Sequence, residues 1–197
     1  MVISASARAE LVKPDVLIRN IAQEVLSIAK QDKANRSGDK KAILALVDAK
    51  VLPYFDFERM TQEAVGRSWR IATPEQKKTL VSEFRNLVVN TYTNAFTSFE
   101  NQTVKVQPVV ISAGADAVTV KTLITKAGAE PIDVDYEMER TVNGWKAFDL
   151  TVDGVSLIIN YRSTFDELVD QSGIDGLIKT LVDKNAANNV LLKSVAK

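Results

Sequence analysis

Apolar and acidic residues alternate without a break in the stretch Ile132-Asp133-Val134-Asp135-Tyr136-Glu137-Met138-Glu139. Successive side chains of a β-strand point to opposite faces, so this period of two predicts a strand over Ile132 to Thr141. One face of that strand is apolar and the other is acidic. Such a division between a dry and a wet face is typical of an antiparallel sheet that packs on one side only.

The neighbouring segments extend this sheet in both directions. Asn143-Gly144 predicts a type I′ hairpin turn into a further strand over Trp145 to Val152. Upstream, β-branched residues between glycine-containing turns predict strands over Ala117 to Lys126 and Val104 to Ile111. Pro108 interrupts the last of these and indicates an edge strand or a bulge. We therefore expect an antiparallel sheet of about four strands.

Apolar residues at helical spacing predict helices on both sides of the sheet. The clearest start signal is Thr73-Pro74-Glu75-Gln76, in which a threonine N-cap, a proline and a glutamine form a capping box. The helix that it opens should run to about Phe99. The other predicted helices cover Pro14 to about Lys30, Asp39 to Val51, Phe57 to Val65, Ser156 to Gly173, and a last stretch from Ile174.

Helices followed by sheet and then by helices again indicate the α+β class. A chain of 197 residues fits one well-buried domain. We expect residues 1–13 to form a disordered N-terminus, residues 14–185 to form the single domain, and residues 186–197 to form a flexible tail. Ala5-Ser6-Ala7 has the small-x-small form of a signal-peptidase site, which a trimmed signal peptide or an ordinary N-terminus would both explain.

The composition excludes several classes of chemistry. The chain has no histidine and no cysteine, so Ser-His-Asp and Cys-His catalysis and His/Cys zinc sites are impossible. No phosphate-binding glycine loop occurs either. Lysine and arginine number 25, as do aspartate and glutamate, so no net field attracts nucleic acid or an anionic membrane. Without a run of about 18 apolar residues, any membrane encounter must rest on local patches or shape.

The acidic row of the alternating strand has two interpretations. Asp133, Asp135, Glu137 and Glu139 lie about 7 Å apart at successive same-face positions, which suits a calcium site or a general acid/base pair. The same spacing is that of a solvated strand face, with Lys121 and Lys146 as cross-strand partners, and we favour this second interpretation.

Arginines beside a tryptophan form another candidate site. Arg67, Trp69 and Arg70 could bind an anionic headgroup, but a packed tryptophan beside solvated arginines is the simpler interpretation. Gly173-Ile174-Asp175-Gly176 matches the GXXG pattern of some RNA-binding loops. Because no cluster of basic residues surrounds it, we favour a corner between two helices.

Periodicity alone does not separate a cavity lining from a filled core, and by itself it favours a closed core. A set of short sequence motifs in a fixed order favours a cavity instead. They are Phe55-Asp56-Phe57-Glu58-Arg59-Met60-Thr61, Ala72-Thr73-Pro74-Glu75-Gln76, Pro131-Ile132-Asp133-Val134-Asp135-Tyr136, Gly154-Val155-Ser156-Leu157, Asn160-Tyr161-Arg162-Ser163 with Phe165, and Gly173-Ile174-Asp175-Gly176-Leu177. In this order, over about residues 10 to 185, they resemble the MlaC or toluene-tolerance family of periplasmic phospholipid-binding proteins.

The resemblance implies a soluble carrier that moves glycerophospholipid between outer and inner membranes and maintains outer-membrane lipid asymmetry. It implies a periplasmic location, no catalysis and no cofactor. The implied partners are an outer-membrane lipoprotein complex and an inner-membrane ABC transporter complex. The implied fold is a curved sheet wrapped by the N-terminal and C-terminal helices around an apolar cavity. Two acyl chains of ~30 methylenes would cost about 25 kcal/mol to expose to water, so a carrier must offer such an interior.

On that interpretation the apolar faces of the long helix and of the strands stand apart and contact acyl tails. The predicted lining comprises Phe84, Leu87, Val88, Tyr92, Phe96, Val118, Val120, Ile124, Ile132, Val134, Tyr136, Met138, Phe148, Leu150 and Val152. Arg67, Arg70 and Arg162 are candidates for contact with a headgroup or a partner.

Two other functions remain open from the residues alone. An enzyme with a carboxylate base would need an acidic residue on the apolar face of the sheet, and Asp149 is the one strand residue we nominate. A ligand-free scaffold between membrane complexes would need a filled core.

Overall fold

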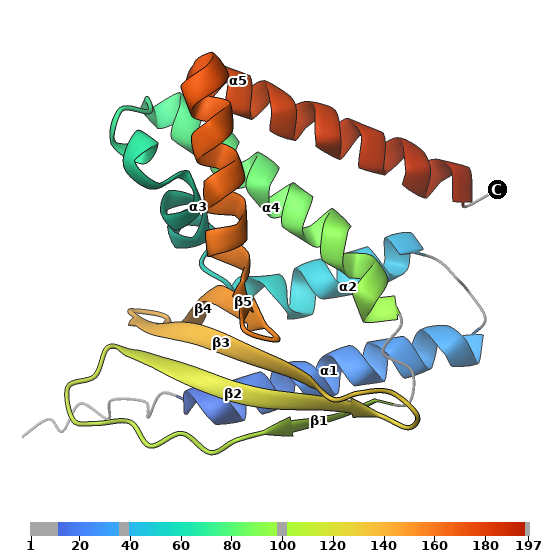
Figure 1. Cartoon of the computed structure of the whole chain (residues 1–197). Helices are drawn as coiled ribbons and strands as arrows, with labels where there is room; N and C mark the ends of the chain where they lie inside the picture. The colour runs from blue at the N-terminus through green and yellow to red at the C-terminus, as the bar shows by residue number, and fades with distance from the viewer. Residues whose placement is uncertain (1–11, 36–39, 98–101, 196–197) are drawn as a thin grey trace, which may run out of the picture.

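The computed structural model describes residues 12–35, 40–97 and 102–195 as an α+β domain (Figure 1). Helices before the sheet are α1 (Pro14–Asn35), α2 (Lys40–Lys50), η1 (Leu52–Tyr54), α3 (Phe57–Val65), η2 (Gly66–Arg70) and α4 (Pro74–Thr97). The strands are β1 (Gln102–Val106), β2 (Ala117–Lys126), β3 (Ile132–Thr141), β4 (Gly144–Val152) and β5 (Val155–Ser156). Helix α5 (Leu157–Val195) follows the last strand.

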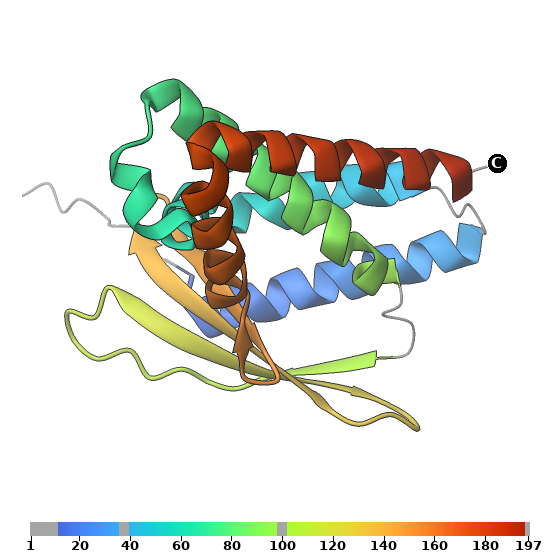
Figure 2. The same ribbon diagram turned by 45° about the horizontal axis from the view of Figure 1, so that its top comes forward.

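The five strands form one antiparallel meander in the order β1-β2-β3-β4-β5. Figures 1 and 2 show the curved sheet as one layer and α3, α4 and α5 as another, with α1 running along the sheet between them. The predicted fold class is therefore confirmed. The extra strand β5 has two residues, which is too short for a period of two to be visible in sequence.

The alternation of β3 divides the sheet as predicted. Val120 and Met138 on the apolar face are 0% exposed. On the other face the Lys121 ammonium lies 3.9 Å from the Asp135 carboxylate, and the Thr119 hydroxyl donates to Glu137 at 2.8 Å. Lys146 pairs with Glu139 in the register of β3 and β4. The acidic row is thus a half-solvated face with cross-strand cations.

Two local predictions about the strands were wrong. Strand β1 ends at Val106 and not at Ile111, because Pro108 has no N–H to continue the ladder. The turn between β3 and β4 is not type I′, since positive φ in it occurs at Gly144 and at no non-glycine residue. Its Thr141 hydroxyl donates to the carbonyl of Gly144 at 2.7 Å and thereby closes the hairpin.

The helix ends follow the sequence signals. The predicted capping box forms: the Thr73 N–H donates to Gln76 Oε1 at 2.9 Å, and the Gln76 N–H donates to Thr73 Oγ1 at 3.2 Å. Gly173 interrupts α5 with φ +70°, and the second half of the helix then returns beside α4 (Figure 1). Residues beyond 185 remain helical to Val195. The flexibility of that tail stays a prediction.

The buried apolar residues form three clusters. The helical cluster joins α3, α4 and α5, the sheet cluster joins α1 to β1–β4, and a small cluster joins α2 to α1. Phe55, which precedes α3, packs against all three. The next residue fixes this junction to the sheet, because the Asp56 N–H donates to the carbonyl of Ala147 at 2.8 Å.

Candidate functional site

The α4 part of the predicted lining lies in the helical cluster. Phe84 is 0% exposed, and its ring makes edge contacts with Tyr161 and Phe165 of α5 at centroid distances of 5.0 and 5.3 Å. Leu87 and Val88 are buried in the same cluster. This part of α4 is therefore packed by side chains of α5. The side chains of Tyr92 and Phe96 lie outside the described residues.

Four residues of the sheet part of the predicted lining lie in the sheet cluster. Val118, Val120, Tyr136 and Met138 pack there with Ile18 of α1. Cross-strand partners share one face of a sheet, and the register pairs Val120 with Tyr136 and Tyr136 with Leu150. The structure thus brings the strand residues onto one face. Val120 and Met138 lie in a different cluster from the α4 residues, whereas Leu150 of β4 packs against the helical cluster.

Burial along this face is uneven. Ile124 and Val134 are each 9% exposed, whereas Ile132 and Val152 are 38% and 39% exposed. Val134 and Val152 are cross-strand partners, so an exposed side chain lies directly beside a buried one. The face is consequently apolar to its edge, and its covering is incomplete at the ends of β3 and β4.

Phe148, which we predicted on this face with Leu150 and Val152, lies at an irregularity of the strand register, and like Leu150 it packs against the helical cluster. A register irregularity pairs Met138 with Ala147 and Glu137 with Asp149, so Phe148 has no partner on β3. The Phe148 ring instead lies 3.4 Å from the Arg59 guanidinium of α3. A bulge inserts one residue and reverses the alternation behind it.

The same bulge explains two residues that sequence reasoning missed. Trp145 and Ala147 belong to the sheet cluster and are 4% and 1% exposed. Trp145 also borders a pocket of about 390 Å³, which Leu17 and Ile21 of α1 help to line. A strict period of two counted back from Leu150 would turn Trp145 and Ala147 away from the apolar face, and no turn residue in β4 signals the bulge.

The structure brings the three predicted arginines together. Arg67 and Arg70 of η2 and Arg162 of α5 line one pocket of about 290 Å³. Its other lining residues are Gln62, Glu63, Gly66 and Trp69. Arg67 and Arg70 are exposed. Trp69, which lies between them in the sequence, is half-buried.

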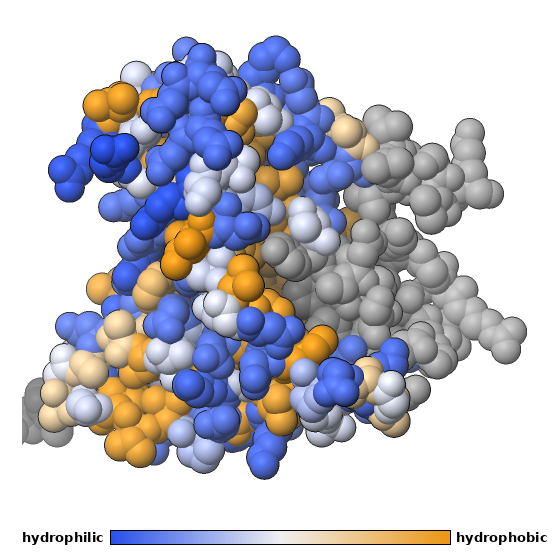
Figure 3. All heavy atoms as spheres, in the orientation of Figure 1, coloured by the Kyte–Doolittle hydropathy of each residue, from blue (hydrophilic) through white to orange (hydrophobic). Residues whose placement is uncertain are grey.

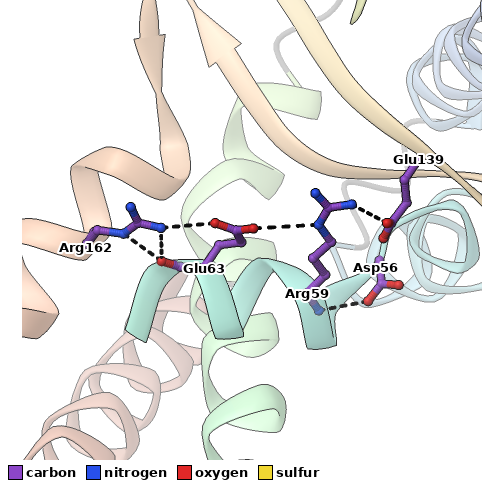
Figure 4. A network of polar contacts seen from close by, with 5 residues as sticks. All are labelled: Asp56, Arg59, Glu63, Glu139 and Arg162. Carbon is purple, nitrogen blue, oxygen red and sulfur yellow. Dashed lines mark hydrogen bonds and ion pairs between the residues drawn. The ribbon is translucent and has the colours of Figure 1, made fainter. Parts of the chain in front are cut away.

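Arg162 is fixed in place by the C-terminal turn of α3 (Figure 4). Its Nε donates to the backbone carbonyl of Glu63 at 2.7 Å, and its Nη2 donates to the Glu63 carboxylate at 3.1 Å. A cation at a helix C-terminus satisfies free carbonyls and favours the helix dipole. Arg162 therefore joins α5 to α3 and also forms one wall of the pocket.

The network continues from Glu63 to the sheet. The other Glu63 oxygen lies 3.8 Å from Arg59 Nε, and the Arg59 Nη1 forms an ion pair with Glu139 of β3 (Figure 4). Asp56 starts the same helix by accepting from the Arg59 N–H at 2.9 Å. Two arginines and two glutamates thus connect α5, α3 and the sheet.

Asp149, the nominated base, has a structural role. It pairs with Glu137 in register, which places it on the wet face and not on the apolar one. Its Oδ1 accepts from the N–H groups of Leu150 at 2.8 Å and Ile158 at 3.1 Å, and the Ser156 hydroxyl donates to its Oδ2. These bonds secure the turn from β4 through β5 into α5.

The described part of the chain contains no group of three His, Cys, Asp or Glu side chains placed to hold a metal ion. Nor, within those residues, is any helix long and apolar enough to cross a membrane. The described fold and these surfaces are those of an α+β binding protein, with an apolar face on the sheet and arginines at an outer corner.

Comparison with known proteins identifies the family. The MlaC protein family model matches residues 19–183, and the chain belongs to the MlaC family. The chain is 22% identical to the intermembrane phospholipid transport system binding protein MlaC of Haemophilus influenzae, over 90% of this chain and 84% of that protein. It is 24% identical to the toluene tolerance protein ttg2D of Pseudomonas putida, over 85% of this chain and 78% of that protein.

A solved structure extends the likeness to three dimensions. The phospholipid-binding protein of Ralstonia solanacearum, solved in complex with a phospholipid, matches with a TM-score of 0.83 and 33% identity. The match covers 90% of this chain and 99% of that one.

Proposed function

We propose that this protein carries glycerophospholipids between the outer and inner membranes and so maintains outer-membrane lipid asymmetry. The observation that carries this proposal is the likeness, over 90% of the chain, to a protein solved with a phospholipid bound. The Haemophilus influenzae relative is named as the binding protein of an intermembrane phospholipid transport system. A carrier of this kind performs no chemistry on its lipid, and Asp149, the one nominated base, already serves the β4–α5 turn.

The same proposal includes a location and partners. An intermembrane carrier works in the periplasm. It would receive lipid from, or deliver it to, an outer-membrane lipoprotein complex and an inner-membrane ABC transporter complex. The support is the transport-system name of the relative.

The acyl tails would lie against the apolar face of the sheet. Burial raises the pKa of Tyr136 to about 12, yet this side chain keeps the accessible surface of a half-buried residue. Tyr136 lies in the middle of the face between Val120 and Leu150, so its partly covered ring would adjoin the predicted lining.

The direct test is extraction of the purified protein with organic solvent, followed by mass spectrometry and phosphate analysis. We expect phospholipid at close to one molecule per chain in repeated preparations. Protein that is consistently free of lipid after expression in a bacterium with phospholipid-rich membranes would contradict the proposal.

A substitution pair locates the tails. Val134→Arg places a charge on the apolar face, where burying it without a partner is unfavourable. This variant should hold less than about a tenth of the lipid of the unmodified protein. Val142→Arg is the matched control, because Val142 is 98% exposed at the hairpin tip, and it should retain its lipid. A folded Val134→Arg variant with full lipid content would move the tails away from this face.

A further inference from the structure

The helical layer ends in an outer corner, residues 66–73, which we call the η2 corner (Figure 1). Gly66 ends α3 with φ +61°, a left-handed conformation that favours glycine, and its N–H donates to the carbonyl of Gln62. A Cβ at Gly66 would lie 3.8 Å from Arg162 Nε, so the corner packs closely against α5. The chain reversal presents Arg67, Trp69 and Arg70 beside Arg162.

The η2 corner carries unpaired positive charge. Three guanidinium groups and one carboxylate line its pocket of about 290 Å³, and that carboxylate, Glu63, faces Arg162 and Arg59. Arg67 and Arg70 make no ion pair with any residue that the structure describes. Lys77 adds a further cation, since its Nζ lies 5.4 Å from the Trp69 ring centroid. Guanidinium groups that lack a carboxylate partner have the geometry that phosphate oxygens match.

An apolar side chain protrudes from the same corner. Ile71 is 76% exposed directly after Arg70. Figure 3 shows hydrophobic atoms beside strongly hydrophilic ones at this outer end of the helical layer. A free phosphate ion would use the arginines alone. Apolar residues of a protein interface gather in a packed centre, whereas Ile71 stands at a tip. Arginines, a tryptophan and a protruding aliphatic residue together are typical of a surface that enters the headgroup region of a membrane.

We propose that the η2 corner docks the protein on anionic lipid surfaces. Arg67 and Arg70 bind headgroup phosphates, Lys77 and Trp69 lie at headgroup level, and Ile71 enters the boundary with the acyl chains. The formal net charge of the chain is zero, so this attraction is local and orients the molecule with one corner toward the membrane. This docking is additional to lipid carriage and does not depend on a lipid in the interior.

The test is co-sedimentation of the full chain with phosphatidylcholine vesicles that contain either no phosphatidylglycerol or about one third of it. We expect binding to the anionic vesicles only, weakening as salt is added. Arg67→Gln/Arg70→Gln should reduce the partition coefficient about 25-fold, from about fivefold per charge. Ile71→Ser should reduce it about fivefold.

A matched control removes two charges elsewhere. Lys126→Gln/Lys184→Gln changes exposed residues of the β2 end and of α5, and binding should stay within about twofold of the unmodified protein. An equal loss in both double variants, or no vesicle binding by the unmodified protein, would overturn the proposal. The proposal would also be overturned if the arginines bound inorganic phosphate or a polyglutamate peptide while the protein showed no affinity for vesicles. Lipid extraction from the same variants tests carriage separately. An arginine variant that keeps its lipid but no longer binds vesicles is the expected result, whereas an unmodified protein that carries lipid but does not bind vesicles contradicts only the docking.

Discussion

The helical cluster and the sheet cluster bury their apolar residues in different ways. In the part of the chain that the structure describes, five of the six largest fully buried side chains are Met60, Leu80, Phe84, Leu177 and Leu181 of the helical cluster. The sheet cluster supplies one, Met138, and the apolar face that it belongs to ends in side chains exposed by 38% and 39%. A filled core and a partly covered face thus coexist in one domain. The first stabilises the fold, and the second is the surface on which the proposed function places the acyl tails.

The largest expected effect comes from truncation in the filled core. Phe84→Ala removes the ring that contacts Tyr161 and Phe165, and should lower the free energy of unfolding by about 3–5 kcal/mol. The lipid content per folded molecule should not change. Urea unfolding with lipid extraction measures both quantities.

Val142→Ala at the exposed hairpin tip is the control and should change stability by less than about 0.5 kcal/mol. A Phe84→Ala protein that keeps its stability but loses its lipid would place the helical cluster in the ligand site and remove the distinction between the two clusters.

The sequence predicted this division only in part. Local signals were sufficient to predict individual helices and strands. The period of two predicted both ends of β3 correctly, and the capping box predicted the start of α4 at Pro74. They were insufficient for the site, because a bulge at Phe148 changes the phase of β4 without any special residue. Which apolar face packs against which depends on tertiary contacts between distant segments. Phe84 and Val120 both stand at regularly spaced apolar positions in the sequence, yet they lie in different clusters.

A second prediction concerns the connection between the clusters. Arg59→Met keeps an apolar stem beside Phe148 but removes the ion pair with Glu139, and should lower the free energy of unfolding by about 1–2 kcal/mol. A double-mutant cycle with Glu139→Gln should give a coupling of about 1 kcal/mol. Additive effects would mean that α3 and the sheet are joined by packing alone. In that case Arg59 would not link the helical cluster to the sheet.

A smaller effect is expected at the start of α4, inside the helical layer. Thr73→Ala removes the acceptor of the Gln76 N–H and should cost about 1 kcal/mol without changing the lipid content. Gln76 also donates to Asp175 at 2.7 Å, so the cap stabilises the corner of α5 as well. Ser82→Ala, on an exposed position of the same helix, is the control. An equal effect of both substitutions on chemical unfolding would mean that the capping box contributes nothing specific.

The smallest effect at neutral pH is expected in the partly covered face. Tyr136→Phe keeps the ring and should change stability at pH 7 by less than about 0.5 kcal/mol. Above pH 10 the two proteins should differ. The pKa of Tyr136 is raised by burial from 10.0 to about 12, so the unfolded chain loses this proton before the folded one does. The contribution of Tyr136 to stability is therefore complete below pH 10 and is lost as the pH rises to about 12.

Across this alkaline range the free energy of unfolding should fall more steeply for the unmodified protein than for Tyr136→Phe. Tyr54→Phe, which removes a phenol that is 38% exposed, is the control for general alkaline effects. If lipid fills the space beside Tyr136, removing it should admit water to the ring and move the titration toward lower pH. A Tyr136 titration that is the same with and without lipid would place the acyl tails elsewhere and leave the sheet face as an ordinary core.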